Sequence, residues 1–185
     1  TPLTDTICDG STYFFNGNPL NISGNYVDTL TSMSGCDSVL TLDIVFSTNP
    51  IVTSPDLQIC LGDSALLIPS GATIYTWTPT VNFVDNLGQM WVSPTLTSNY
   101  VLQGTNLQGC LDLDTVTVTV NPLPIVQLVA NDNTVCPNTP VQLNASGATS
   151  YSWSGIDLSS FTGSSQSITA QTSGMYSIIG TSQFG

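Results

Sequence analysis

The sequence SGATIYTW, from Ser70 to Trp77, is repeated as SGATSYSW, from Ser146 to Trp153, with an offset of 76 residues. The same offset relates three further pairs of landmarks: Cys60 and Cys136, Tyr100 and Tyr176, and the segments GTNLQG at 104–109 and GTSQFG at 180–185. A constant offset at four landmarks, with no net insertion, indicates an internal repeat. Residues 51–122 and 123–185 are therefore predicted to be two copies of one fold.

The first 48 residues form a shorter relative of these copies. GCDSVLTLDIVF, which begins at Gly35, and GCLDLDTVTVTV, which begins at Gly109, both place a Gly-Cys pair before an alternating run. Each run leads to an Asn-Pro dipeptide, at 49–50 and at 121–122. Proline cannot donate a hydrogen bond to a β-ladder, so these dipeptides are typical of boundaries. The sequence predicts three modules, at residues 1–48, 49–122 and 123–185.

A period of two within the modules predicts β-strands. Val116, Val118 and Val120 would point to one face of a strand, and the threonines between them to the other. Gly, Asn, Pro and Ser separate the further strands that we expect at residues 65–68, 73–77, 89–92 and 99–102. About seven short strands in some 72 residues are typical of an immunoglobulin-like sandwich. The predicted fold class is all-β, with tandem immunoglobulin-like or PKD-like sandwich modules.

Aromatic residues recur at equivalent positions in the two copies. Trp77 and Trp153 would lie on a central strand, and Tyr100 and Tyr176 on the penultimate strand, near the position of a tyrosine corner. We therefore expect these rings to pack in the core rather than to form a platform for carbohydrate. Trp91 has no counterpart in the third module, which makes it the better candidate for an exposed, ligand-facing ring, but we expect core packing for this ring too.

The charges exclude several classes of function. All 12 charged residues are Asp, and there is no Glu, Lys, Arg or His, so the formal net charge is −12. Nucleic-acid binding is excluded because no cation can neutralise phosphate, and anionic membranes repel the chain. Without His, Ser-His-Asp and Cys-His nucleophiles cannot be assembled. No stretch approaches the ~20 apolar residues of a membrane span, so membrane insertion is not expected. The chain is predicted not to be an enzyme.

Metal binding has little support in the sequence. Zinc would have to rely on Cys and Asp, and no CxxC pair exists. Asp112 and Asp114 share one face of a strand and would be the place for calcium, but there is neither a DxDxDG loop nor a Glu. We expect a solvated aspartate pair and no cofactor.

Five cysteines flank the modules. Cys8 and Cys36 bracket module one, and Cys60 and Cys110 bracket module two, which predicts two within-module disulfides of about 3–4 kcal/mol each. In a standard sandwich the turns that carry Cys60 and Cys110 lie at opposite ends, so either the strand frame is unusual or the bridges cross modules. The offset puts the partner of Cys136 at position 186, so we expect a continuing polypeptide, or a neighbouring chain, to supply that cysteine and the last strand.

Module one, which contains ICDGSTYFFNG and GCDSVLTLDIVF, resembles a short repeat of very large secreted surface proteins of Bacteroidetes-type bacteria. Modules two and three resemble the PKD-like or immunoglobulin-like repeats of these proteins, through their C-GDS, Y-W, Y-V and GC landmarks. Such proteins include gliding-motility adhesins, are exported by the type IX system, and act as stalks, adhesins or fibres. The resemblance implies an extracellular or cell-surface location, with neighbouring modules of the same long chain or fibre as partners.

The resemblance also implies O-glycans on Ser or Thr between an Asp and an apolar residue. The sequence has five such candidates: Thr6, Thr29, Ser38, Ser64 and Thr115. Two N-glycosylation sequons occur as well, at Asn21 and Asn144.

The main functional prediction is a structural or adhesive repeat segment of a large secreted cell-surface protein. One alternative is a carbohydrate-binding accessory region of a secreted enzyme, in which Trp91 would contact surface glycans. Another is a filament subunit that assembles by strand donation, because module three would lack its last strand. Without that strand, the residues around Tyr176 and Ile178 would be exposed to water.

Overall fold

The computed structural model describes residues 3–31, 35, 37–156, 158 and 161–184, which form sixteen β-strands and no helix. The all-β fold class is therefore confirmed. The chain divides into two compact units, Thr1–Leu57 with Ser64–Thr119, and Gln58–Asp63 with Val120–Gly185. Below, residues 1–48, 49–122 and 123–185 are called the first, middle and third segments, whose boundaries as modules stay a prediction.

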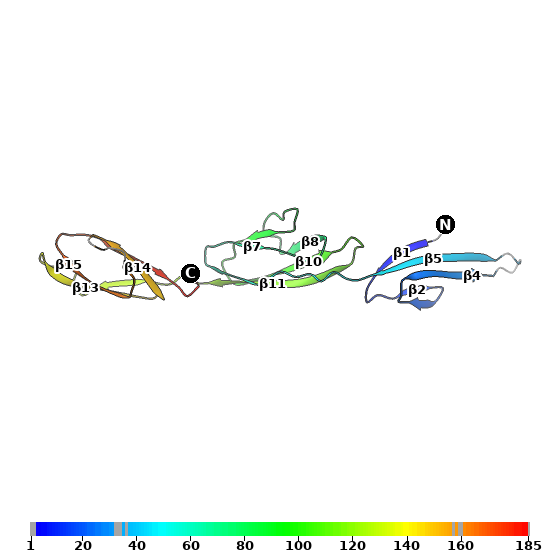
Figure 1. Ribbon diagram of the computed structural model, residues 1–185, viewed down its shortest axis with the longest axis horizontal. Helices are drawn as coiled ribbons and strands as arrows, with labels where there is room; N and C mark the ends of the chain where they lie inside the picture. Colours follow the sequence, from blue (N-terminus) through cyan, green and yellow to red (C-terminus); the bar gives the residue numbers. More distant parts are fainter. Residues whose placement is uncertain (1–2, 32–34, 36, 157, 159–160, 185) are drawn as a thin grey trace. The chain divides into compact units, whose positions relative to one another are not determined.

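The first segment is built around one long central strand. β5 (Ser38–Ser47) lies between β1 (Leu3–Cys8), which runs parallel to it, and β4 (Gly24–Leu30), which runs antiparallel. Figure 1 shows these three strands side by side. Alternation along β5 leaves Leu42 and Ile44 fully buried. These two side chains form the small core of the segment.

A tight hairpin completes the first segment. It joins β2 (Tyr13–Phe15) to β3 (Asn18–Leu20) through Asn16 and Gly17, whose φ angles are 46° and 81°. Positive φ at both central residues is the geometry of the two-residue turn that an Asn-Gly dipeptide favours. The predictions above do not include this hairpin, although the dipeptide is a signal for it.

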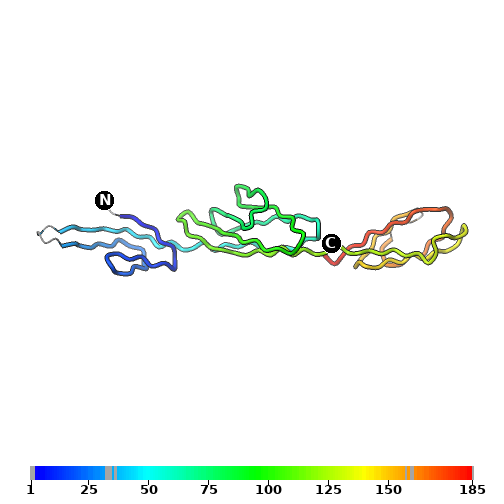
Figure 2. Tube along the Cα trace, turned by 180° about the vertical axis from the view of Figure 1, so that it is seen from behind, coloured from blue at the N-terminus to red at the C-terminus, as the bar shows by residue number. Residues whose placement is uncertain are grey.

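The middle segment is a sandwich of a four-stranded and a two-stranded sheet. Val116 and Val118 from the larger sheet, and Leu67 and Val92 from the smaller one, are fully buried, so the core lies between the sheets. In both views of the chain, β10 and β11 run side by side (Figures 1 and 2). The sheet orders are β6-β11-β10-β8 and β7-β9, with bounds β6 (Leu57–Cys60), β7 (Ala65–Leu67), β8 (Ile74–Thr78), β9 (Met90–Val92), β10 (Ser98–Thr105) and β11 (Leu111–Asn121).

The third segment has a three-stranded and a two-stranded sheet. Val141, Leu143 and Trp153 are the centre of its core, together with partly buried side chains such as Tyr176 and Ile178. The sheet orders are β12-β13-β15 and β14-β16, with bounds β12 (Gln127–Ala130), β13 (Thr139–Ser146), β14 (Ser150–Gly155), β15 (Ser165–Ala170) and β16 (Tyr176–Thr181).

The repeated tryptophans make the same contact in both segments. The ring of Trp77 is 2% exposed and its Nε1 donates to the carbonyl of Gly88 over 2.8 Å. Trp153 is 3% exposed and donates to the carbonyl of Gly163 over 2.7 Å. A buried indole with a satisfied N–H is a core group, which confirms core packing for both rings.

The repeated tyrosines differ from the expected tyrosine corner. The hydroxyl of Tyr75 on β8 donates to the carbonyl of Ala72 and accepts from its N–H, both at 2.7 Å. Tyr151 on β14 does the same with Ala148 at 3.0 Å. This contact holds the SGAT turn against the strand that follows it. The bond between a hydroxyl and the local backbone is thus made on β8, two strands earlier in the chain than β10, which carries Tyr100.

The glycine of the SGAT motif is required by a close approach of the backbone. Gly71 has a φ of +96°, and a Cβ placed on it would lie 1.8 Å from the carbonyl oxygen of Ile51. At Gly147, with a φ of +95°, the corresponding distance is 1.9 Å to the carbonyl oxygen of Ile125. Only glycine fits at these two positions. The most constant part of the repeat is therefore the place where the turn contacts the incoming chain.

Candidate functional site

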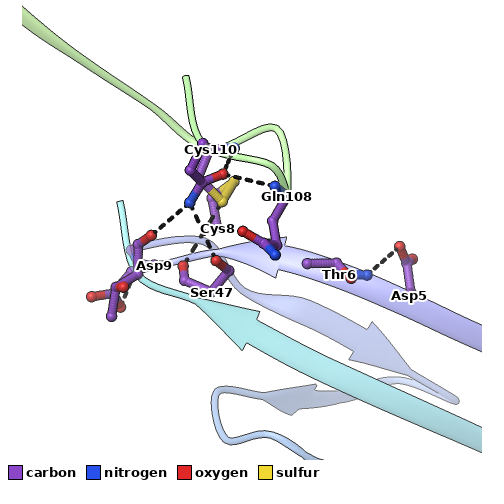
Figure 3. The surroundings of a disulfide bond; sticks show 10 residues. Asp5, Thr6, Cys8, Asp9, Ser47, Gln108 and Cys110 are labelled. Atoms are coloured by element: carbon purple, nitrogen blue, oxygen red, sulfur yellow. Dashed lines mark hydrogen bonds between the residues drawn. A yellow bond between two sulfur atoms is a disulfide. The ribbon is translucent and has the colours of Figure 1, made fainter. Parts of the chain in front are cut away.

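A disulfide joins the first segment to the middle one. Cys8, at the end of β1, is bonded to Cys110, immediately before β11, with an S–S distance of 2.10 Å and a Cα–Cα distance of 5.3 Å (Figure 3). The predicted Cys8–Cys36 and Cys60–Cys110 pairings are therefore wrong, because the disulfide joins the first and middle segments instead. Cys36 lies outside the described residues.

Hydrogen bonds around this disulfide hold the chain where it leaves the first segment. Asp9 N–H donates to the carbonyl of Ser47 over 2.8 Å, and Asn106 Nδ2 donates to the carbonyl of Thr48 over 3.0 Å. Asn106 Oδ1 in turn accepts the N–H of Cys110 over 2.9 Å. Figure 3 shows Cys8, Asp9, Ser47 and Cys110 drawn together. We call Cys8, Asp9, Ser47, Thr48, Asn106 and Cys110 the junction.

The pairing follows from the strand register. β1 and β5 run parallel and end together, with Cys8 opposite Ser47. The loop between β10 and β11 reaches this edge and buries Cys110 completely. Because the partners are 102 residues apart in sequence, their contact depends on the tertiary arrangement and not on local spacing. This is the physical reason why the bracketing of modules by cysteines did not reveal the pairing.

The other cysteines differ in their surroundings. Cys60 is partly buried at the end of β6, and the next residue, Leu61, donates its N–H to the carbonyl of Asn121 over 2.9 Å. That bond repeats the one between Asp9 and Ser47 at the junction. Cys136 is exposed. Its pairing with a further cysteine stays a prediction.

Asp112 and Asp114 have a structural role. The carboxylate of Asp112 accepts the N–H of Val52 over 3.1 Å, and that of Asp114 accepts the N–H of Ser54 over 2.9 Å. The two carboxylates thus serve as acceptors for backbone N–H groups of the segment that precedes Pro55. The expectation of a merely solvated pair is therefore wrong. Among the described residues, no group of three or more Cys or Asp side chains is placed to hold a metal ion.

Trp91 lies on an exposed face of the middle segment. Its side chain is 56% exposed, so the expectation of core packing for this ring is wrong, and its carbonyl accepts Asn82 Nδ2 over 2.6 Å. That bond fixes β9 next to a loop in which Phe83 is 82% exposed, with Val81 and Leu87 also exposed. β9 and the loop before it thus carry one indole, one phenyl and two aliphatic side chains that are exposed. Contact of Trp91 with a ligand stays a prediction.

The glycosylation candidates all lie at the surface. At Thr6, Thr29 and Thr115 the backbone N–H of the threonine donates to the carboxylate of the preceding Asp over 2.8 to 2.9 Å. The sequon residues Asn21 and Asn144 are exposed too. Accessibility permits modification, and occupancy stays a prediction. The exposed O-glycan candidates are Thr6, Thr29, Ser38, Ser64 and Thr115.

In the described part of the chain, no helix is long and apolar enough to cross a membrane. No protein-family model matches the sequence, and no curated protein matches it.

Solved structures of multi-domain proteins are similar to the chain at low identity. One is a Ca2+-stabilized adhesin with which an Antarctic bacterium binds ice, at 14% identity and a TM-score of 0.35, covering 80% of this chain and 48% of the other. Another is the N-terminal eight Ig domains of Down Syndrome Cell Adhesion Molecule, at 10% identity and a TM-score of 0.45, covering 97% of this chain and 40% of the other. A third is immunoglobulin domains 1–5 of Sidekick-1, at 12% identity and a TM-score of 0.36, covering 86% of this chain and 48% of the other. This chain spans less than half the length of each.

Proposed function

We propose that this chain is a structural or adhesive repeat segment of a secreted cell-surface protein, and that it has no enzymatic activity. The observation that carries the proposal is the disulfide between Cys8 and Cys110. A disulfide of this kind belongs to an oxidising compartment such as the cell exterior. It also joins two consecutive segments rather than two parts of one segment, and such a bridge restrains the joint of an extended array.

The junction restrains motion where neighbouring domains ordinarily hinge. Linkers between domains bend by default unless a large interface opposes the motion. Here the connection at Ser47 and Thr48 is held by Asn106 and by the N–H of Asp9, and the disulfide closes the contact. A stalk or adhesin benefits from such a joint because the binding end is kept away from the cell surface. The resemblance of the sequence to secreted Bacteroidetes-type surface proteins supports export by the type IX route.

Single-molecule stretching from both termini tests the proposal. With the bridge intact, the loop between Cys8 and Cys110 cannot extend, although 102 residues separate the two cysteines. Reduction should therefore lengthen the fully unfolded chain by roughly 35 nm, at ~3.6 Å per residue. A Cys8→Ser/Cys110→Ser variant should have the longer contour in both conditions, and Cys136→Ser should behave like the unmodified chain. Equal contour lengths before and after reduction would contradict a load-bearing junction.

The surface around Trp91 supports adhesion to a glycan as a second candidate function. The exposed indole of Trp91 and the exposed phenyl ring of Phe83 each offer a flat apolar face of the kind that stacks on sugar rings. A glycan array probed with the purified chain should give signals that fall on Trp91→Ala. Phe14→Ala is the matched control, because Phe14 is 67% exposed but lies in the first segment. Signals that survive Trp91→Ala, or that fall equally with Phe14→Ala, would remove this candidate.

A further inference from the structure

A long hollow opens into the core of the third segment. Its volume is about 730 Å³, and its apolar wall includes Val135, Val141, Leu143, Ile168 and Tyr176. The rim is polar, and its one ionisable carboxylate belongs to Asp132. The hollow lies between residues 132–137 on one side and the start of β16 on the other. It is therefore a groove along the edge of a sheet, with a floor made of core side chains.

The edge of β16 that borders this groove has no strand paired to it in the described residues. β16 pairs with β14 on its other side, from Gly155 opposite Tyr176 to Ser150 opposite Thr181. An edge of this kind presents unpaired N–H and C=O groups that can accept an added strand.

The middle segment shows what occupies the equivalent place. There β10, the counterpart of β16, has β8 on one side and β11 on the other. In the register of β10 and β11, Val116 lies opposite Tyr100 and Val118 opposite Ser98. Both valine side chains are fully buried. The residues 76 positions after Tyr100 and Ser98 are Tyr176 and Gly174, and both line the groove.

Burial confirms that the floor of the groove is a core that a further strand could cover. Tyr100 is buried in the middle segment, whereas Tyr176 is only partly buried. Val92 is fully buried opposite Ala65 on β7, whereas Ile168, which lies opposite Val141, is only partly buried. Tyr100 and Val92 are thus buried in the segment that contains β11, whereas their counterparts in the third segment, Tyr176 and Ile168, line the groove and are only partly buried.

We infer that this groove binds an extended polypeptide segment of the β11 type, antiparallel to β16, with valines or similar residues at alternate positions. Its apolar side chains would enter the hollow opposite Tyr176 and Gly174, and its threonines would face solvent. A carboxylate at the positions opposite Tyr176 and Gly174 would be excluded, because it would lose water against an apolar floor close to Asp132. The inference goes beyond the proposed function and does not depend on the junction.

Peptide binding to the full chain, with its disulfide intact, tests the inference. The probe is a fluorescent peptide with the sequence of Leu111–Asn121, LDLDTVTVTVN, followed by anisotropy. We expect saturable binding that weakens at least about tenfold with Val116→Asp and Val118→Asp in the peptide. A Thr117→Ser peptide, changed on the outward face, should bind within about twofold of the original.

Two further measurements locate the bound peptide. Ala170→Leu in the protein should reduce the affinity because Ala170 lines the groove, whereas Thr169→Leu should not, because Thr169 is exposed on the other face of β15. Hydrogen exchange, read after pepsin digestion, should slow at residues 174–181 and 131–137 on binding and stay unchanged across β4 and β5. The peptide comparison and the exchange map keep the test decisive if Ala170→Leu does not fold.

Three outcomes would overturn the inference. They are no saturable binding, equal binding of the peptide with aspartates, and protection outside the groove. Concentration-dependent dimers that protect residues 174–181 without peptide would show instead that a second copy covers the groove. Failure here would leave the junction and the proposed function untouched, because those depend on residues of the other unit.

Discussion

The middle and third segments repeat one set of contacts but differ in how their cores are closed. In both, a buried tryptophan donates to a glycine carbonyl, and a tyrosine hydroxyl holds the SGAT turn. In the middle segment β10 also pairs with a further strand, β11, whereas no described strand pairs with the corresponding edge of β16 in the third segment. The repeated contacts thus form without that strand. They fix the sandwich, whereas the last strand excludes water from one side of its core.

The path of the first strand differs in the same two segments. In the third segment, β12 pairs with β13 through four residues, from Gln127 to Ala130. In the middle segment, only Thr53 bridges to Ser70 before Pro55 interrupts the ladder, and the chain then joins the other sheet as β6. Because proline lacks an N–H, Pro55 cannot extend the pairing that Thr53 begins.

The largest expected effect is the loss of a core tryptophan. Trp77→Ala and Trp153→Ala should each lower the free energy of unfolding of their own segment by about 3–5 kcal/mol. Since the third segment has the less covered core, Trp153→Ala should unfold that segment alone in water. Circular dichroism in denaturant, with hydrogen exchange to assign each transition, measures this. Unfolding of the middle segment by Trp153→Ala would show that the two cores are not independent.

Removal of the junction disulfide should have the next largest effect. Cys8→Ser with Cys110→Ser should lower the unfolding free energy of the first unit by about 2–4 kcal/mol, because the bridge restrains a long loop in the unfolded chain. The third segment should keep its unfolding midpoint. Cys136→Ser serves as the control, since Cys136 is exposed. A loss of the same size in the third segment would contradict the assignment of the bridge.

Replacement of the acceptor carboxylates should have a smaller effect, confined to the middle segment. Asp114→Ala leaves the N–H of Ser54 without its partner and should cost about 1–2 kcal/mol. Asp114→Asn should restore most of that stability, because its amide oxygen can still accept. Asp43→Ala, at an exposed position on β5, is the control. Urea denaturation compares the three variants, and an equal loss for Asp43→Ala would point to a general charge effect.

The smallest expected effect is on the pH dependence of the unfolding free energy of the middle segment. Burial raises the pKa of Tyr100 above its usual value. Between the unfolded and the folded pKa, the folded state keeps a proton that the unfolded state releases, so stability is lost as pH rises above about 10. Tyr100→Phe should therefore show a shallower alkaline decline of unfolding free energy. An unchanged decline would mean that Tyr100 contributes nothing to it.

Local patterns predicted much of the fold. The alternation in β11 and the repeated SGAT turn identify strands and core residues, because burial alternates along a strand whatever it pairs with. The pairing of Cys8 with Cys110 could not be predicted, because it depends on where the loop between β10 and β11 lies. The acceptor role of Asp114 depends on the path of residues 52–56. The hairpin at Asn16 could have been predicted from its Asn-Gly dipeptide.

Peptide mapping of the native protein without reduction shows directly whether a disulfide joins Cys8 to Cys110. Trypsin has no site in a chain without Lys or Arg, so a protease that cleaves beside Asp or aromatic residues is required. We expect a linked pair of fragments, one with Cys8 and one with Cys110, that separate on reduction. Linked fragments of Cys8 with Cys36, or of Cys60 with Cys110, would show instead that each module is stapled within itself, and would contradict the disulfide-closed junction.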